Sequence, residues 1–167
     1  MDKRLEIIFS RRSIRRYTGE AVSDADVKSL LEAGMAAPSA SNRKPWHFVT
    51  VTDRDLLNAL AAAQPYGKML AHAPLAIAVC GDPALSDWWV QDCTAATENI
   101  LVAAAGLGLG AVWLGCHGSP ERVQSTRELL GVPERIGVLS LLSVGHPGEK
   151  KESRTQFDAS RVHTGTW

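Results

Sequence analysis

The sequence predicts an α+β fold in which helices cover a mixed central sheet of about four to five strands. Two short apolar runs, 75–80 and 111–114, suit strands buried on both faces. The longest helical segment, 88–106, is apolar on almost every side after Glu98, which is typical of a helix in the middle of a fold. Predicted helices and strands follow one another along the chain, an order that favours layered packing.

The chain has the size and composition of one globular domain, predicted to span residues 1–167. It is 45% hydrophobic and 22% charged, and its formal net charge at pH 7 is zero. A chain of this length buries roughly 70% of its unfolded surface and folds without disulfides. Because no global field favours polyanions, we expect neither nucleic acid nor a membrane surface as partner.

The cysteines and histidines form no metal or disulfide pattern. Three cysteines are an odd number without a CxxC pair, and five histidines are scattered, so we expect neither a disulfide framework nor a metal site. The N-terminus has no signal-peptide pattern. The apolar run 100–116 is interrupted by glycines and predicts a buried helix leading into a strand, not a membrane span. We therefore expect a cytoplasmic protein.

The N-terminal half begins with a short helix over 5–10, followed by a basic segment over 11–16. Ser23 with Asp26 three residues later predicts a helix start, and apolar residues at helical spacing continue towards Pro38. A loop over 38–45 precedes a strand from Trp46 to Val51, in which Trp46, Phe48 and Val51 are expected on one face.

The C-terminal half contains a helix over 53–63, an irregular connection over 65–72, and the buried strands and long helix already named. Ser119-Pro120 combines an N-cap with proline at the first helical position and opens a helix to Leu130. A last strand covers 136–144. The polar tail 148–167 cannot form its own core, so it is either disordered or adds an edge strand to a second subunit.

The segment from Arg11 to Arg16 places four guanidinium groups and the hydroxyl of Ser13 close together. Guanidinium forks match phosphate oxygens in two-pronged geometry, so this segment predicts an anion site. The alternatives are a solvated basic face and a nucleic-acid patch.

Two further segments have features of ligand-binding motifs. The loop from Pro38 to Trp46 is rich in short polar side chains, and Asn42 could pair with the edge of a heterocycle, although an ordinary polar loop has the same composition. The glycines at 106, 108 and 110 end a helix and enter a strand. A dinucleotide-binding loop has the opposite context, so these glycines predict a helix cap and close packing.

Taken in order, these motifs resemble the nitroreductase family of flavin enzymes. They are R-R-S-x-R from Arg11, A-A-P-S-A-S-N-x-x-P-W, G-L-G-L-G-A-V-W-L-G, L-L-G-V-P, and G-H-P before a basic tail. The resemblance implies FMN bound at the interface of an intertwined homodimer with an exchanged C-terminal tail.

The resemblance also implies roles for individual residues. Arg11, Arg12 and Ser13 match positions that hold the phosphate and the adjoining ring edge, and Arg15 matches a basic position near the N1–O2 edge of the flavin. The backbone of the segment Leu114–Gly115 matches the segment that donates towards N5.

Further positions match contacts from other parts of the dimer. Pro38, Ser39 and Ala40 match the loop supplied by the second subunit, and Asn42 matches the residue that reads the polar ring edge. Arg154, together with Lys151, matches a second phosphate contact.

By the same resemblance, the chain is expected to be an FMN-dependent oxidoreductase that passes hydride from NADH or NADPH to a small electron-poor acceptor such as a nitroaromatic or a quinone. The cofactor supplies the chemistry, so no catalytic side chain is nominated. The alternative is a protein that binds flavin or another phosphorylated ligand without turnover. Lys44 stands where the family often has Gln, and the short segment before the long helix leaves a minimal lid.

Overall fold

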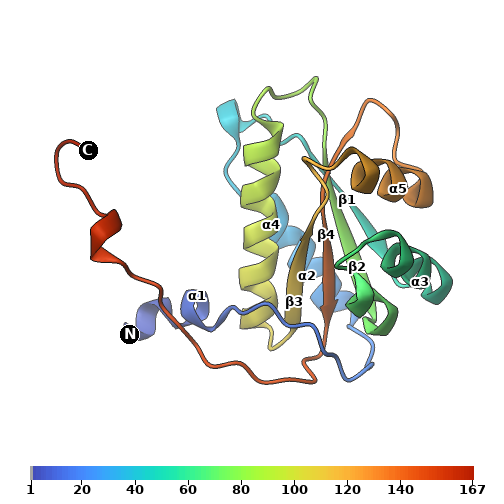
Figure 1. The fold of residues 1–167 in the computed structure, drawn as a ribbon, viewed down its shortest axis with the longest axis horizontal. Helices are drawn as coiled ribbons and strands as arrows, with labels where there is room; N and C mark the ends of the chain where they lie inside the picture. Colours follow the sequence, from blue (N-terminus) through green and yellow to red (C-terminus); the bar gives the residue numbers. More distant parts are fainter. Residues whose placement is uncertain (1) are drawn as a thin grey trace.

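The computed structural model describes residues 2–167, and Met1 of the predicted domain lies outside them. Its centre is a sheet of four strands in the order β1-β2-β4-β3 (Figure 1). Each strand lies close to where the sequence predicts one. The strands are β1 (Trp46–Val51), β2 (Leu75–Gly81), β3 (Gly110–Gly115) and β4 (Gly137–Gly145).

The expectation of a mixed sheet is wrong for these strands, because all three strand pairings are antiparallel. β2 and β3 run in the same direction, but β4 lies between them and pairs with both. Within residues 2–167 the one parallel pairing is an isolated bridge between Ser13 and Ala111. The order of elements along the chain does not reveal that the last strand inserts into the middle of the sheet.

Helices cover both faces of the sheet (Figure 1). α2 (Asp24–Met35) and α4 (Trp89–Gly106) lie on one face, and α3 (Arg54–Ala63) and α5 (Pro120–Leu130) lie on the other. β2 serves both cores: Leu75, Ile77 and Val79 face α4, while Ala76 and Ala78 face the opposite helices. This explains why β2 reads as an uninterrupted apolar run.

Of the two predicted helix caps, the one at Ser23 is confirmed and the one at Ser119 differs, while Asp53 makes a cap that was not predicted. The hydroxyl of Ser23 accepts from the N–H of Asp26 at 3.1 Å, and the carboxylate of Asp53 accepts from that of Leu56 at 2.9 Å. Ser119 occupies the N-cap position of α5, but its side chain makes no cap bond. Proline at the first position of α5 removes one of the N–H groups that have no partner within a helix.

The glycines between α4 and β3 act as predicted. α4 ends at Gly106, and Gly108 has a φ of +73°, a conformation that few other residues adopt. A Cβ on Gly110 would lie 2.6 Å from Cγ2 of Ile14. The N-terminal segment can therefore cross the start of β3 at close range.

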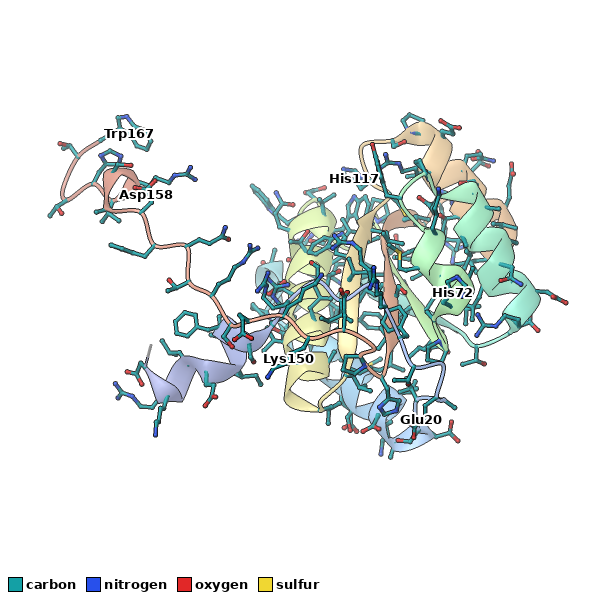
Figure 2. The ribbon with its side chains drawn as sticks, turned by 60° about the horizontal axis from the view of Figure 1, so that its bottom comes forward. Glu20, His72, His117, Lys150, Asp158 and Trp167 are labelled. Carbon is teal, nitrogen blue, oxygen red and sulfur yellow. The ribbon has the colours of Figure 1, made fainter. Side chains whose placement is uncertain are left out.

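Both ends of the chain lie away from the sheet (Figures 1 and 2). A 3₁₀ turn (Lys3–Leu5) and α1 (Glu6–Ser10) precede the basic segment, and the tail passes beside α1 towards Asp158 and Trp167. The side chains of Phe157 and Trp167 are 79% and 100% exposed. Shorter 3₁₀ turns are η2 (Ala40–Asn42), η3 (Lys68–His72) and η4 (Ala159–Arg161). Among residues 2–167, no helix has the length and apolar character that a membrane crossing requires.

Candidate functional site

A cavity of about 230 Å³ lies beside the C-terminal end of β3. It brings together Arg15 and the pair Leu114–Gly115, which the sequence analysis assigned to the same ligand although about a hundred residues separate them. Its other lining residues are Gln64, Tyr66, Trp113 and Arg122. The cavity thus combines two cations, aromatic rings and a strand edge.

The backbone of β3 faces this cavity because β3 is an edge strand. The carbonyl of Ala111 accepts from Ile14 N–H at 3.0 Å, and that of Gly115 accepts from the Arg122 guanidinium at 3.2 Å, so both carbonyls point away from β4. Alternate residues of a strand direct their backbone groups to the same side, so the N–H of Gly115 also faces the open edge. A Cβ on Gly115 would have no neighbour within 4 Å.

Hydrogen bonds made by Arg15 and its neighbours hold this part of the backbone in place. The Tyr17 hydroxyl donates to the carbonyls of Ile14 at 2.9 Å and Ser143 at 3.0 Å, and burial raises the pKa of Tyr17 to about 12. The backbone N–H of Arg15 donates to the Glu149 carboxylate at 2.6 Å, and this bond lowers the pKa of Glu149. The backbone is therefore fixed where Arg15 lines the cavity.

A second cavity, of about 200 Å³, lies on the α4 side of the same segment and is lined by three further basic residues. It brings Arg12 together with Lys151, both predicted contacts, and adds Lys150, which was not predicted although it stands beside Lys151. Arg12 donates to the carbonyl of Glu152. The Lys151 ammonium donates to the carbonyl of Ser13 at 2.5 Å and lies 3.4 Å from the Glu149 carboxylate.

Three predicted contacts from the N-terminal segment and the tail, Arg11, Ser13 and Arg154, line neither cavity. Arg11 forms an ion pair with Glu98 on α4, with Nε and Oε1 3.1 Å apart. Arg154 is exposed, and its backbone N–H donates to the carbonyl of Phe9 at 3.1 Å. Arg11 and Arg154 thus lie beside α1, outside the set of residues that lines the cavity with Arg12.

The loop that contains Pro38, Ser39, Ala40 and Asn42 lies at the N-terminal end of α4. The N–H of Ala40 donates to the Asp92 carboxylate at 2.8 Å, and this buried carboxylate also accepts from the Ser86 hydroxyl at 2.8 Å. The same chain's loop lines neither cavity beside β3.

This loop has a strained backbone. Ser41, Asn42 and Lys44 have φ angles of 51°, 56° and 50°. Such angles cost energy in non-glycine residues and persist where surrounding contacts hold them. Asp92 supplies such a contact, yet it lies 52 residues from Ala40 and gave no sequence signal.

Among residues 2–167 no group of three or more His, Cys, Asp or Glu side chains could hold a metal ion. All three cysteines are buried and unpaired, and burial raises the pKa of Cys80 and of Cys93 to about 12. These thiols therefore stay protonated and are poor nucleophiles.

Comparison with known proteins identifies relatives along the whole chain. The model described as "Nitroreductase family" matches residues 8–146. A provisionally named NADH dehydrogenase/NAD(P)H nitroreductase of Archaeoglobus fulgidus is 48% identical over the full length of both chains.

Solved structures agree with this relationship. A provisionally named NADH dehydrogenase/NAD(P)H nitroreductase from Parabacteroides distasonis superposes with a TM-score of 0.96 at 38% identity, and each chain is covered completely. A provisionally named nitroreductase from Desulfovibrio desulfuricans, solved in complex with FMN, has a TM-score of 0.84 at 35% identity, covering 100% of this chain and 99% of that one. The chain therefore belongs to the nitroreductase family.

Proposed function

We propose that this chain is an FMN-dependent oxidoreductase that transfers hydride from NADH or NADPH to an electron-poor acceptor such as a nitroaromatic or a quinone. The observation that carries the proposal is the pair of cavities on either side of the segment 10–15. One contains Arg12 and Lys151, and the other contains Arg15 beside the open end of β3. A relative solved with FMN has the same fold at 35% identity.

The residues present fit FMN. The cavity with Arg12, Lys150 and Lys151 offers cations suited to a phosphate group. The cavity beside Gly115 offers an outward N–H and open space where a side chain would obstruct a flat ring. Both cavities border β3, at Ala111 and at Gly115, so one elongated ligand with an anionic end could occupy both.

FMN, when bound, supplies the hydride-accepting ring. The protein's own residues bind and orient it. Arg15 would place a positive charge at the ring edge where negative charge collects on reduction, and this lowers the energy of the reduced state. The backbone N–H of Gly115 would hold the N5 side of the ring in register with β3. No side chain needs to exchange a proton with the nicotinamide.

We further propose that the functional unit is a homodimer. The loop with Ser39 and Asn42 lies away from the cavities of its own chain, and a second copy would bring its loop to them. The exposed apolar side chains of the tail, Phe157 and Trp167, would be covered in the same assembly. The proposed location remains the cytoplasm, and the proposed partners are a second copy and small molecules.

The purified protein tests the proposal directly. We expect a yellow protein whose flavin absorption bleaches when NADH or NADPH is added without oxygen, and returns when a nitroaromatic or quinone is added. Flavin that stays oxidised in the presence of both nicotinamides would favour a flavin-binding protein without turnover. A colourless protein that takes up no added FMN would contradict both the oxidoreductase and the flavin-binding protein without turnover.

A further inference from the structure

The cavity beside the C-terminal end of β3 has a rim that the proposed FMN contacts do not use. Tyr66 follows α3, and Arg122 belongs to the first turn of α5. The guanidinium carbon of Arg122 lies 5.2 Å from the centre of the Tyr66 ring. A cation over an aromatic face is attracted by the ring, so the two side chains favour one another's positions. We call this pair the Tyr66–Arg122 rim.

The rim is built on a fixed base. The N–H of Gly67 donates to the carbonyl of Gln64 at 2.9 Å, which closes a turn around Tyr66. The buried Gln64 side chain donates to the Thr126 hydroxyl at 2.9 Å and thereby ties this turn to α5. Tyr66 is 72% exposed, yet its backbone is anchored to the helix that carries Arg122.

Arg122 is a cation without an acidic partner. One of its N–H groups donates to the carbonyl of Gly115, and the other donors remain available. Across residues 2–167, no carboxylate lies within ion-pair distance of Arg122. The cavity wall contains Arg15 and Arg122 but no acidic side chain, so the cavity attracts anions.

We propose that the Tyr66–Arg122 rim is a subsite for an anionic group on the redox partner of the flavin. This inference rests on the proposed function, which assigns Arg15 to the cofactor and leaves Arg122 for another ligand. The tyrosine face suits a planar molecule, and a guanidinium matches a carboxylate in two-pronged geometry. The expected class is a planar acceptor that carries a carboxylate. The phosphates of the nicotinamide donor offer the same anionic chemistry.

Binding measurements on the FMN-loaded protein test the subsite. Benzoate and benzamide differ in charge but little in shape, and calorimetry together with the flavin difference spectrum reports their affinities. In the wild type, benzoate should bind more tightly than benzamide. Arg122→Gln should weaken benzoate about tenfold or more, because it removes a charge-assisted bond, while the affinity for benzamide stays unchanged.

Matched variants separate the effect of the Arg122 charge from that of the Tyr66 ring and from that of losing any surface arginine. Arg135→Gln removes one exposed arginine from the loop after α5, outside this cavity, and should change neither affinity. Tyr66→Phe keeps the ring and should retain benzoate binding. Tyr66→Leu removes the ring and should weaken both ligands.

Rapid mixing then distinguishes the two sources of the anion. If Arg122→Gln slows reoxidation by 4-nitrobenzoate but not by 4-nitrobenzamide, the acceptor's carboxylate occupies the rim. If Arg122→Gln instead slows reduction of the flavin by NADH, the phosphates of the donor occupy the rim. Either result supports the subsite.

Other outcomes overturn the proposal, and they can be told apart. Equal wild-type affinities for benzoate and benzamide, or discrimination that persists in Arg122→Gln, would remove the subsite and leave the proposed function intact. Release of FMN from Arg122→Gln would make Arg122 a cofactor contact instead. A wild-type protein that binds no FMN would overturn the proposed function and the subsite with it.

Discussion

At the scale of single residues, the chain places its charges unevenly around one short segment. Arg11 is paired with Glu98, whereas Arg12 and Arg15 line the two cavities on either side of Ile14. Glu149 holds the backbone of Arg15 and lies near Lys151, so an acidic residue orders the basic segment without lining the cavity beside Gly115. The overall net charge of zero hides this local arrangement.

The arginines that line the cavities should matter most for FMN. Replacing Arg12 and Arg15 together by Ala should raise the dissociation constant for FMN, because each change removes a charge-assisted contact worth about 1.5–3 kcal/mol. Fluorescence titration of the apoprotein with FMN measures the effect, and circular dichroism checks that the fold survives. Arg135→Ala, in an exposed arginine of the loop after α5 that lines neither cavity, serves as a control for the loss of charge. An unchanged dissociation constant would assign the cluster to another ligand.

Asp92 should position the loop that carries Ser39 and Asn42. Asp92 is 5% exposed and its carboxylate accepts from both Ala40 and Ser86, so Asp92→Ala leaves the half-buried N–H of Ala40 and the buried hydroxyl of Ser86 without partners. We expect a loss of about 2–3 kcal/mol in the free energy of unfolding and faster tryptic cleavage after Arg43. Urea unfolding and timed proteolysis measure the two effects.

The effect on the loop can be separated from general loss of stability. Asp87→Ala removes an exposed carboxylate from the connection between β2 and α4 and should leave cleavage after Arg43 unchanged. If Asp92→Ala loses stability while cleavage after Arg43 keeps its wild-type rate, Asp92 stabilises the core and does not position the loop.

The sequence revealed some of these residues and not others. Arg15, Leu114 and Gly115 were recognised because they stand in ordered motifs, and the structure brings them to one cavity. Asp92 and Arg122 stand in no motif. Their roles depend on contacts across the fold, such as that between Asp92 and Ala40, and a single sequence carries no local sign of such a contact.

At the scale of elements, strands and caps were predictable because their signals are local. Apolar runs located β2 and β3, and Ser23 located the start of α2. Strand order depends instead on which elements pair in three dimensions, so the insertion of β4 was missed. Within β1, the expectation that Val51 shares a face with Trp46 is wrong. Five positions separate them, an odd number, and they belong to opposite cores.

One contact between elements deserves a direct test. Gly81 and Gly137 face each other across β2 and β4, and the Trp89 ring of α4 lies over both. A Cβ on Gly137 would overlap this ring. Gly137→Ala should therefore lower the free energy of unfolding by about 1–3 kcal/mol, as overpacked cores do. Urea unfolding of the purified variant measures the loss.

A double-mutant cycle identifies the cause. In a Trp89→Leu background the added methyl group meets a smaller, more flexible side chain, so Gly137→Ala should cost less there than in the wild type. If the two substitutions are additive, the ring of Trp89 is not what requires glycine at this position.

At the scale of the whole molecule, the tail is the part that the single chain leaves uncovered. From Glu152 onwards every residue is exposed, including Phe157, Val162 and Trp167 (Figure 2). The sequence predicted that the tail cannot form its own core, and the structure agrees. Its exchange with a second subunit remains a prediction, because it concerns contacts between copies of the chain.

Two truncations test that exchange and separate assembly from cofactor binding. Deleting Lys151–Trp167 removes the basic contacts and the apolar side chains, so we expect monomer or aggregate in sedimentation and loss of FMN. Deleting Gln156–Trp167 keeps Lys151 and Arg154 but removes Phe157 and Trp167, so assembly should weaken while the remaining cations still hold some FMN. Because a monomer lacks the loop with Ser39 and Asn42 from its partner, flavin retention in the shorter deletion should rise with protein concentration. If the chain without Lys151–Trp167 stays dimeric and keeps its FMN, neither the exchanged tail nor the contact from Arg154 exists.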